Sequence, residues 1–235
     1  VSGNATGAVV EDGTTVTTSG QLSVTDADGG EAVFAAGSQD GDYGSFSVDD
    51  AGNWTYNLTS NDSPEVQALG EGDVLTETFT VQTADGTTQD VTVTIAGSND
   101  VARISGAATG AVVEDEALTA SGQLAVSDVD TGEAVFSAAT ADGAYGTFSV
   151  DEAGHWTYNL TDGENPAVQS LGDGDSLTET FTVQTADGTS QTVTVSINGN
   201  NDAAQIPGDT TGLVTEDAST PSASGVLSVT DVDTG

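Results

Sequence analysis

Apolar and polar residues alternate in many short runs along this chain. Ser45–Val48, Trp54–Leu58 and Val91–Ile95 each place an apolar side chain at every second position. Such a period of two predicts strands with one buried and one solvated face, and the Thr and Val residues in these runs favour strands. Loop-forming residues separate the runs, for example at Ala84–Thr87, whose Asp-Gly pair predicts a hairpin turn. The pattern therefore predicts an all-β chain.

One short helical turn is expected at Ser63–Gly70. Ser63 is a typical N-cap, Pro64 suits the first helical position, and Gly70 suits the end of a helix. This turn connects two predicted strands and leaves the all-β prediction unchanged.

Several motifs recur along the chain. The sequence Gly-Ala-Val-Val-Glu-Asp at Gly7 returns at Gly110, and it returns as Gly-Leu-Val-Thr-Glu-Asp at Gly212. A repeat of about 100 residues suits one independently folding sandwich of about seven strands. We therefore expect tandem cadherin- or immunoglobulin-like β-sandwiches arranged end to end. The expected domains are residues 1–100, residues 101–202 and, at residues 203–235, the start of a third, truncated repeat.

The chain is strongly acidic. It has 38 Asp and Glu residues against one Lys or Arg and one His, which gives a formal net charge of −37. This charge excludes nucleic acid and anionic membrane surfaces as partners, because both are negative themselves. The absence of Cys excludes disulfides and thiolate metal sites. An acidic surface suited to high salt, or one that only opposes aggregation, is the alternative to cation binding.

Targeting segments are not expected within this sequence. No window approaches 18 consecutive apolar residues, so we expect no membrane insertion. The opening Val1–Asn4 lacks the features of a signal peptide, and the chain stops within a repeat. We therefore expect a fragment of a longer protein.

The expected strand directions gather acids at the junctions between repeats. An odd number of strands places the C-terminal pole of one repeat against the N-terminal pole of the next. At the first junction the candidate ligands are Glu11, Glu71, Asp73, Asn99 and Asp100 from the first repeat and Asp128, Asp130 and Asp187 from the second. Ca²⁺ takes about six to eight oxygen ligands and offsets the repulsion between clustered carboxylates, whereas Mg²⁺ demands a tighter geometry. We therefore predict Ca²⁺ sites at the junctions.

The corresponding acids elsewhere are candidate ligands as well. They are Glu114, Asp173, Asp175, Asn201 and Asp202 in the second repeat, Glu216, Asp231 and Asp233 in the third, and Asp26, Asp28 and Asp85 in the first. Asp12, Asp115, Glu31 and Glu133 lie beside them. A solvated turn or strand end is the alternative for all of these acids, since Asp favours turns in any case.

The same motifs resemble those of known families. Val10-Glu11-Asp12, Asp26-Ala27-Asp28, Ala84-Asp85 and Asn99-Asp100 resemble the Ca²⁺-ligand positions of a cadherin repeat. The match departs in one loop, where Glu71 stands in place of a cadherin Asp and Asp73 in place of a cadherin Glu.

The chain is still more similar to the bacterial VCBS repeat. This similarity rests on Asp42–Phe46, Gly52–Tyr56 and Gly97–Asp100. The resemblance implies a Ca²⁺-rigidified β-sandwich in a large RTX adhesin, which a type I system secretes to the bacterial surface for attachment or biofilm formation.

Three functions compete at this point. Near-identical repeats favour a structural extender whose partners are Ca²⁺ and neighbouring repeats of the same chain, and whose charge keeps the fragment monomeric. A glycan- or protein-binding module acting through exposed loops is the alternative, although Trp54 and Trp156 are expected in the core. A hydrolase with paired carboxylates is disfavoured because no large non-repeated domain offers a pocket. His155 occupies the turn position of Asn53, which indicates a surface residue, and we expect no enzymatic activity.

Overall fold

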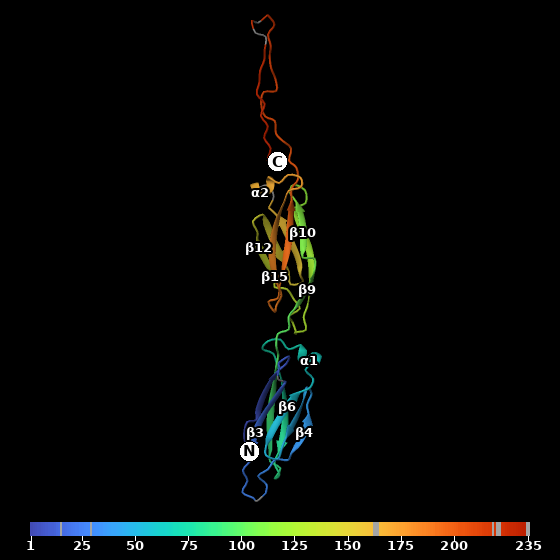
Figure 1. Cartoon of the computed structure of the whole chain (residues 1–235), viewed down its shortest axis with the longest axis vertical. Coiled ribbons are helices and arrows are strands. Elements are labelled where there is room, and N and C mark those ends of the chain that lie inside the picture. The colour runs from blue at the N-terminus through green and yellow to red at the C-terminus, as the bar shows by residue number, and fades with distance from the viewer. Residues whose placement is uncertain (15, 29, 162–164, 218, 220–221, 234–235) are drawn as a thin grey trace. The chain divides into compact units, whose positions relative to one another are not determined.

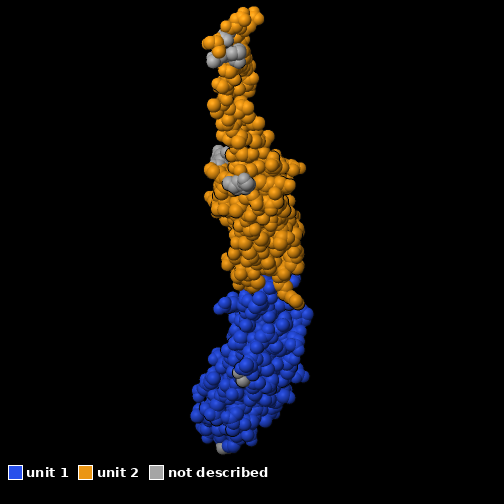
Figure 2. Space-filling model, turned by 45° about the horizontal axis from the view of Figure 1, so that its top comes forward, with its two compact units in different colours: residues 1–102, 127–134 blue, residues 103–126, 135–235 orange. Residues whose placement is uncertain are grey.

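The computed structural model describes the chain except for residues 15, 29, 162–164, 218, 220–221 and 234–235. The described residues form two compact units (Figure 2). Unit 1 consists of residues 1–102 and 127–134, and unit 2 consists of residues 103–126 and 135–235. Segment 127–134, which the repeat pattern assigns to the second repeat, belongs to unit 1 by its contacts.

Unit 1 is a sandwich of two sheets. Its strands are β1 (Ser2–Gly3), β2 (Thr6–Val10), β3 (Thr17–Ser23), β4 (Gly37–Asp40), β5 (Gly44–Val48), β6 (Asn53–Leu58), β7 (Val74–Gln82) and β8 (Thr88–Ala96). One sheet has the order β1-β3-β6-β5-β4 and the other has the order β2-β8-β7. The first strand of the expected sandwich is divided, because β1 pairs with β3 in one sheet and β2 pairs with β8 in the other. The predicted all-β sandwich is confirmed.

Unit 2 repeats this architecture (Figure 1). Its strands are β9 (Arg103–Gly106), β10 (Thr109–Val113), β11 (Thr119–Ser127), β12 (Ala139–Asp142), β13 (Gly146–Val150), β14 (His155–Leu160), β15 (Ser176–Gln184) and β16 (Ser190–Asn198). The sheets have the orders β12-β13-β14-β11-β9 and β10-β16-β15. In both units one pair, β2 with β8 or β10 with β16, is parallel, so the first and last strands of a sandwich end at the same pole.

A single helical turn precedes the seventh strand of each sandwich. Helix α1 spans Pro64–Gln67 and α2 spans Pro166–Gln169. The Ser63 side chain caps α1 by accepting a hydrogen bond from the backbone N–H of Val66, as the sequence predicts. The helix ends at Gln67, three residues before the expected Gly70.

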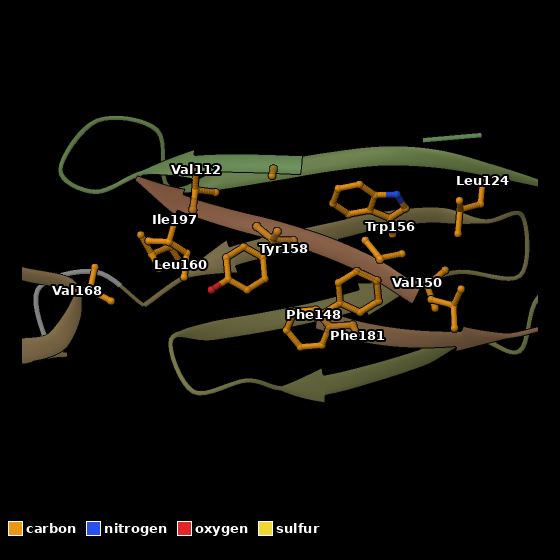
Figure 3. Packing of buried hydrophobic residues seen from close by; sticks show 14 of the residues in the cluster. Val112, Leu124, Phe148, Val150, Trp156, Tyr158, Leu160, Val168, Phe181 and Ile197 are labelled. Carbon is orange, nitrogen blue, oxygen red and sulfur yellow. The ribbon is translucent and has the colours of Figure 1, made fainter. Parts of the chain in front are cut away.

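The core of each sandwich is built on an aromatic cluster. In unit 2, Phe148 and Phe181 stack with their ring centroids 4.6 Å apart, and Trp156 and Tyr158 complete the cluster (Figure 3). The indole N–H of Trp156 donates to the backbone carbonyl of Ala107 at 2.7 Å, which satisfies the one polar atom of the ring. Because Trp156 is 0% exposed, the expected core role is confirmed and the ring offers no platform for a sugar.

The described part of residues 203–233 holds two short pairings, Gln205 with Thr230 and Gly208 with Leu227. Leu227 lies at the third copy of the position that Leu22 and Leu124 occupy in the cores of the two units, but it is exposed. Within the described residues, no helix has the length and apolar character needed to cross a lipid bilayer.

Candidate metal centre

A cluster of acids lies at one pole of unit 1. Glu11 follows β2 and Asp100 follows β8, and the parallel pairing of these two strands brings both acids to the same end of the sandwich. Asp128 and Asp130 come from segment 127–134, which also belongs to unit 1. Three segments that are far apart in the sequence thus supply the acids of one cluster.

Glu11 is a buried carboxylate, with 1% of its surface exposed. Its Oε1 accepts a hydrogen bond from the backbone N–H of Ser98 at 3.1 Å, and its Oε2 accepts one from the side-chain amide of Gln67 at 3.5 Å. Burial raises the pKa of Glu11, the Ser98 N–H opposes that rise, and the negative charges of Asp12, Asp100 and Asp130 add to it. The ionised form of Glu11 therefore lacks a compensating positive charge.

Hydrogen bonds hold the aspartates of the cluster in place. The backbone N–H of Asp130 donates to Asp128 Oδ1 at 2.9 Å, which closes a tight Asx turn. The backbone N–H of Asp100 donates to Asp130 Oδ2 at 2.8 Å. A further bond from the N–H of Thr131 to the carbonyl of Ala68, at 3.1 Å, ties segment 127–134 to the end of α1.

Three carboxylate oxygens of this cluster are buried without a hydrogen-bond partner among the described residues. They are Asp100 Oδ2, Asp128 Oδ2 and Asp130 Oδ1. Asp130 is only 3% exposed, so bulk solvent has little access to its carboxylate. Burial, and after it the charges of Asp12, Asp130 and Asp128, raise the pKa of Asp100.

A cation fits this donor set better than any group of the protein does. Burying an ionised carboxylate is unfavourable unless it is paired or bound to a metal. The chain has only one Lys or Arg, so its own side chains cannot neutralise the acids. Clustered carboxylate oxygens are the ligands that hard cations such as Ca²⁺ take.

Unit 2 carries the same arrangement. Glu114 is 1% exposed, and its Oε1 accepts a hydrogen bond from the backbone N–H of Asn200 at 3.1 Å. The N–H of Asp202 donates to Asp233 Oδ2 at 2.8 Å, and the N–H of Asp233 donates to Asp231 Oδ1 at 3.1 Å. Asp233 Oδ1 is buried without a hydrogen-bond partner in the described part of the chain. The repetition of these contacts shows that the arrangement belongs to the repeat.

Several predicted ligands have exposed side chains, unlike the buried Glu11 and Asp130. Glu71, Asp73, Asp173, Asp175, Asn99, Asn201 and Glu216 are exposed. The buried Gly70, one residue before Glu71, faces the cluster of unit 1 instead, because a Cβ built on it would lie 3.7 Å from Asp130 Cγ. The side-chain amides of Asn99 and Asn201 each donate to the backbone carbonyl of the next residue, at 2.7 Å.

Asp85 and Asp187 serve the turns of their hairpins. Asp85 accepts hydrogen bonds from the backbone N–H of Thr87 at 3.0 Å and from the hydroxyl groups of Thr83 and Thr87. Asp187 accepts the equivalent bonds from Thr189 and Thr185. These bonds occupy both oxygens of each carboxylate, which is the turn role that the Asp-Gly sequence favours regardless of metal.

Asp26 and Asp28 lie at the opposite pole of unit 1 together with Glu31. One carboxylate oxygen from each of the three lies within 4.8 Å of the others. The N–H of Asp28 donates to Asp26 Oδ1 at 2.8 Å, which is the same turn that Asp128 and Asp130 form. The Asp-x-Asp segment therefore adopts its conformation in all three copies.

Two donors of the centre were not predicted from the sequence. Gln67 and Gln169 end the helical turns of their repeats, and each aims its amide at the buried glutamate of its own unit. The available signal was a Gln at the same place in both copies, four residues after the helix cap. His155, by contrast, lies on the surface as predicted and pairs with Asp151 at 3.1 Å.

Comparison with known proteins identifies the family. The model of the bacterial cadherin-like domain matches residues 1–97 and again residues 99–199. No curated protein matches the chain. The solved structures that resemble it include fragments of cadherins from mouse and Drosophila.

Three solved cadherin structures show how similar they are to this chain in sequence identity, coverage and TM-score. Mouse cadherin-23 EC22-24 is 17% identical with a TM-score of 0.49, and the match covers 99% of this chain and 76% of that one. Protocadherin gammaB7 EC3-6 is 18% identical with a TM-score of 0.49, covering 98% and 55%. Protocadherin gamma B3 EC1-4 is 13% identical with a TM-score of 0.45, covering 99% and 58%, so the chain spans less than two thirds of either protocadherin fragment. Because the family model matches most of the sequence in two consecutive copies, the chain belongs to the family of bacterial cadherin-like domains.

Proposed function

We propose that this chain forms calcium-binding extender repeats of a bacterial cell-surface adhesin. The observation that carries the proposal is the set of buried carboxylate oxygens without hydrogen-bond partners among the described residues, at Asp100, Asp128 and Asp130. These oxygens lie in a cluster with Glu11, in a chain with almost no basic residues. A bound divalent ion supplies the positive charge that the cluster needs.

Calcium in this centre links three segments of unit 1. It joins the end of β2 through Glu11, the linker after β8 through Asp100, and segment 127–134 through Asp128 and Asp130. Binding therefore restricts the linker that leads from one repeat to the next, and in this way calcium rigidifies the junction. Extracellular calcium sites typically bind with a Kd of about 0.1–1 mM, so such a site is filled outside the cell.

The proposed route of secretion and the proposed adhesin role rest on this calcium dependence and on the sequence motifs. In the cytosol calcium is scarce, so the repeats remain loosely held and suited to export by a type I system. Outside the cell they take up calcium and extend an RTX-type adhesin for attachment and biofilm formation. The high negative charge opposes self-association, and the chain is monomeric.

Thermal melting with and without calcium tests the proposal. At 10 mM Ca²⁺ and a Kd of about 0.1 mM, binding stabilises the folded state by about 2.7 kcal/mol. For a domain of about 100 residues this raises the Tm by roughly 10–20 °C relative to chelator. Asp130→Asn removes one charged ligand and should abolish most of this rise in unit 1.

Magnesium at the same concentration is the control. A chain with a net charge of −37 is stabilised by any divalent salt through screening, and Mg²⁺ measures that contribution. A Tm in Ca²⁺ no higher than the Tm in Mg²⁺ would show that the cluster is a solvated acidic surface, and the proposal would then be wrong.

A further inference from the structure

We propose that Glu133 is an additional calcium ligand of the centre in unit 1, and that residue 70 is glycine because the Glu133 carboxylate occupies the space beside it. This inference rests on the proposed function, since it adds a ligand to the same centre. It also explains a glycine that the sequence pattern assigned to the end of a helix.

The space beside Gly70 carries the first part of the argument. The φ angle of Gly70 is not in the left-handed region, so its backbone conformation does not require glycine. A Cβ atom added to Gly70 would lie 2.9 Å from Glu133 Oε1, which is shorter than a van der Waals contact. The next atoms, Cβ and Cγ of Asp130, are 3.7 Å away and would accept an ordinary contact. The carboxylate of Glu133 is therefore the group that a larger side chain at position 70 would displace.

The position of Glu133 relative to Asp130 carries the second part. The backbone N–H of Glu133 donates to the carbonyl of Asp130 at 3.3 Å, so the chain turns between them, and atoms of both side chains lie beside Gly70. Glu133 Oε2 is shielded from solvent. Asp130, only 3% exposed, has its Oδ1 buried without a partner among the described residues at this same place beside Gly70. A cation bound at Asp130 Oδ1 would have the Glu133 carboxylate beside it as a further oxygen donor.

The same spacing brings three carboxylates together elsewhere in the chain. Asp26, Asp28 and Glu31 have the sequence spacing of Asp128, Asp130 and Glu133, and their oxygens lie within 4.8 Å of one another. The two aspartates are held by the same turn in both places. In the first copy the local fold of this segment therefore places the glutamate toward the aspartates. Without a cation, a third carboxylate in the group only increases the repulsion.

Two substitutions test the role of Glu133, and each has a matched control in the same chain. Glu133→Gln removes the charge of the carboxylate and keeps its shape, and its control is Glu31→Gln. Gly70→Ala displaces the carboxylate, and its control is Gly172→Ala. Gly172 occupies the equivalent place in unit 2, where an added Cβ would meet nothing closer than Asp233 Cβ at 3.8 Å among the described atoms.

The readout is cleavage by trypsin, which acts after Lys and Arg. The chain has a single such residue, Arg103, and it lies three residues after the candidate ligand Asp100. The rate of cleavage after Arg103 is measured as Ca²⁺ is raised, for the full 235-residue chain and each variant. A small arginine peptide in the same buffers corrects for the effect of calcium on trypsin itself.

In the wild type we expect calcium to slow this cleavage with a midpoint in the range of extracellular calcium sites. Glu133→Gln and Gly70→Ala should each raise that midpoint at least tenfold, since the number of charged ligands sets the affinity of such sites. The two controls should leave it unchanged. In chelator, Glu133→Gln should melt at the same temperature as the wild type or higher, because it removes repulsion, whereas loss of a purely structural residue would lower the Tm.

The outcomes separate the two proposals. If wild-type cleavage does not depend on calcium, the proposed function fails. In a second outcome, wild-type cleavage depends on calcium, but the midpoints of both variants equal that of the wild type or change no more than the midpoints of their controls. In that case Glu133 is not a ligand, and the inference is overturned while the proposed function stands.

Discussion

The hydrogen bond between Tyr56 and Glu77 is a sensitive point in the core of unit 1. Glu77 lies on β7, is 7% exposed, and accepts a hydrogen bond through Oε2 from the hydroxyl of Tyr56 on β6, in the opposite sheet. Its Oε1 accepts one from the backbone N–H of Tyr43 at 3.1 Å. A Cβ on Gly41 would overlap that oxygen, so glycine is needed there for the carboxylate to fit. The carboxylate thus joins the two sheets and the hairpin between β4 and β5.

Tyr56→Phe removes the hydroxyl donor and keeps the aromatic ring. A hydrogen bond to a charged group contributes about 1.5–3 kcal/mol, and the loss leaves one oxygen of a buried carboxylate unsatisfied. The packing change is small because only one oxygen atom is deleted. We therefore expect the free energy of unfolding of unit 1 to fall by about 2 kcal/mol, which lowers its Tm by roughly 8–16 °C.

Differential scanning calorimetry of the full chain in chelator measures this change. Tyr158→Phe is the matched variant, because Tyr158 donates to Glu179 at 2.6 Å in unit 2 and its loss should lower the other transition by a similar amount. A double-mutant cycle with Glu77→Gln isolates the hydrogen bond from the rest of the tyrosine. A loss below about 0.5 kcal/mol, or a coupling energy near zero in that cycle, would refute the reasoning.

Three further predictions concern other parts of the molecule. Burial, reinforced by the hydrogen bond to Glu77, raises the pKa of Tyr56 above its ordinary value of 10.0, and burial does the same for Tyr158 beside Glu179. A group whose pKa is raised by folding contributes its full stability below its unfolded pKa, and this contribution is lost as the pH rises above that value. The free energy of unfolding measured by urea titration should therefore fall steeply above about pH 10, and less steeply in Tyr56→Phe. Parallel pH profiles for the wild type and the variant would contradict this. Gly20→Ala should destabilise unit 1 by about 1–3 kcal/mol through overpacking, because the added Cβ would lie 2.6 Å from the buried indole of Trp54. Gly37→Ala is the control and should leave the stability unchanged, because no described atom lies within 4 Å of its added Cβ. Asp85→Ala should lower the Tm of unit 1 and leave the calcium midpoint of the trypsin assay unchanged, and a raised midpoint would identify a ligand.

The fold could be predicted because strand alternation depends on local sequence alone. The turn at Ser63 and the core position of Trp54 follow from the same local rules. Glu77 was missed although a signal was present: it stands at an apolar position of the alternating run that contains Leu75, Phe79 and Val81. A carboxylate at a core position indicates a buried partner, and the partner tyrosine lies in a different sheet, which alternation cannot identify.

The candidate centre was only partly predictable. Glu11 and Asp100 lie at the same pole because β2 and β8 are parallel neighbours, which the strand count implied. The loop that contains Glu71 was placed at the correct end of the sandwich, but which of its residues faces the acids depends on backbone geometry. The N–H of Asp73 donates to the carbonyl of Gly70 at 3.0 Å, and this tight turn leaves Glu71 on the exposed side. Residue spacing alone does not determine such a turn.

In a chain with 38 acids, the direction of the pKa change separates two kinds of carboxylate. Hydrogen bonds from Asn53 lower the pKa of Asp49, and bonds from the hydroxyl of Thr83 and then the N–H of Thr87 lower that of Asp85, so both acids are satisfied as anions by their own turns. Burial raises the pKa of Glu11 and Asp100, and like charges add to it, so these acids are unsatisfied as anions. A folded chain retains such unfavourable charges where an external cation compensates them. The acids that the protein stabilises least are therefore the ones most suited to bind a metal ion.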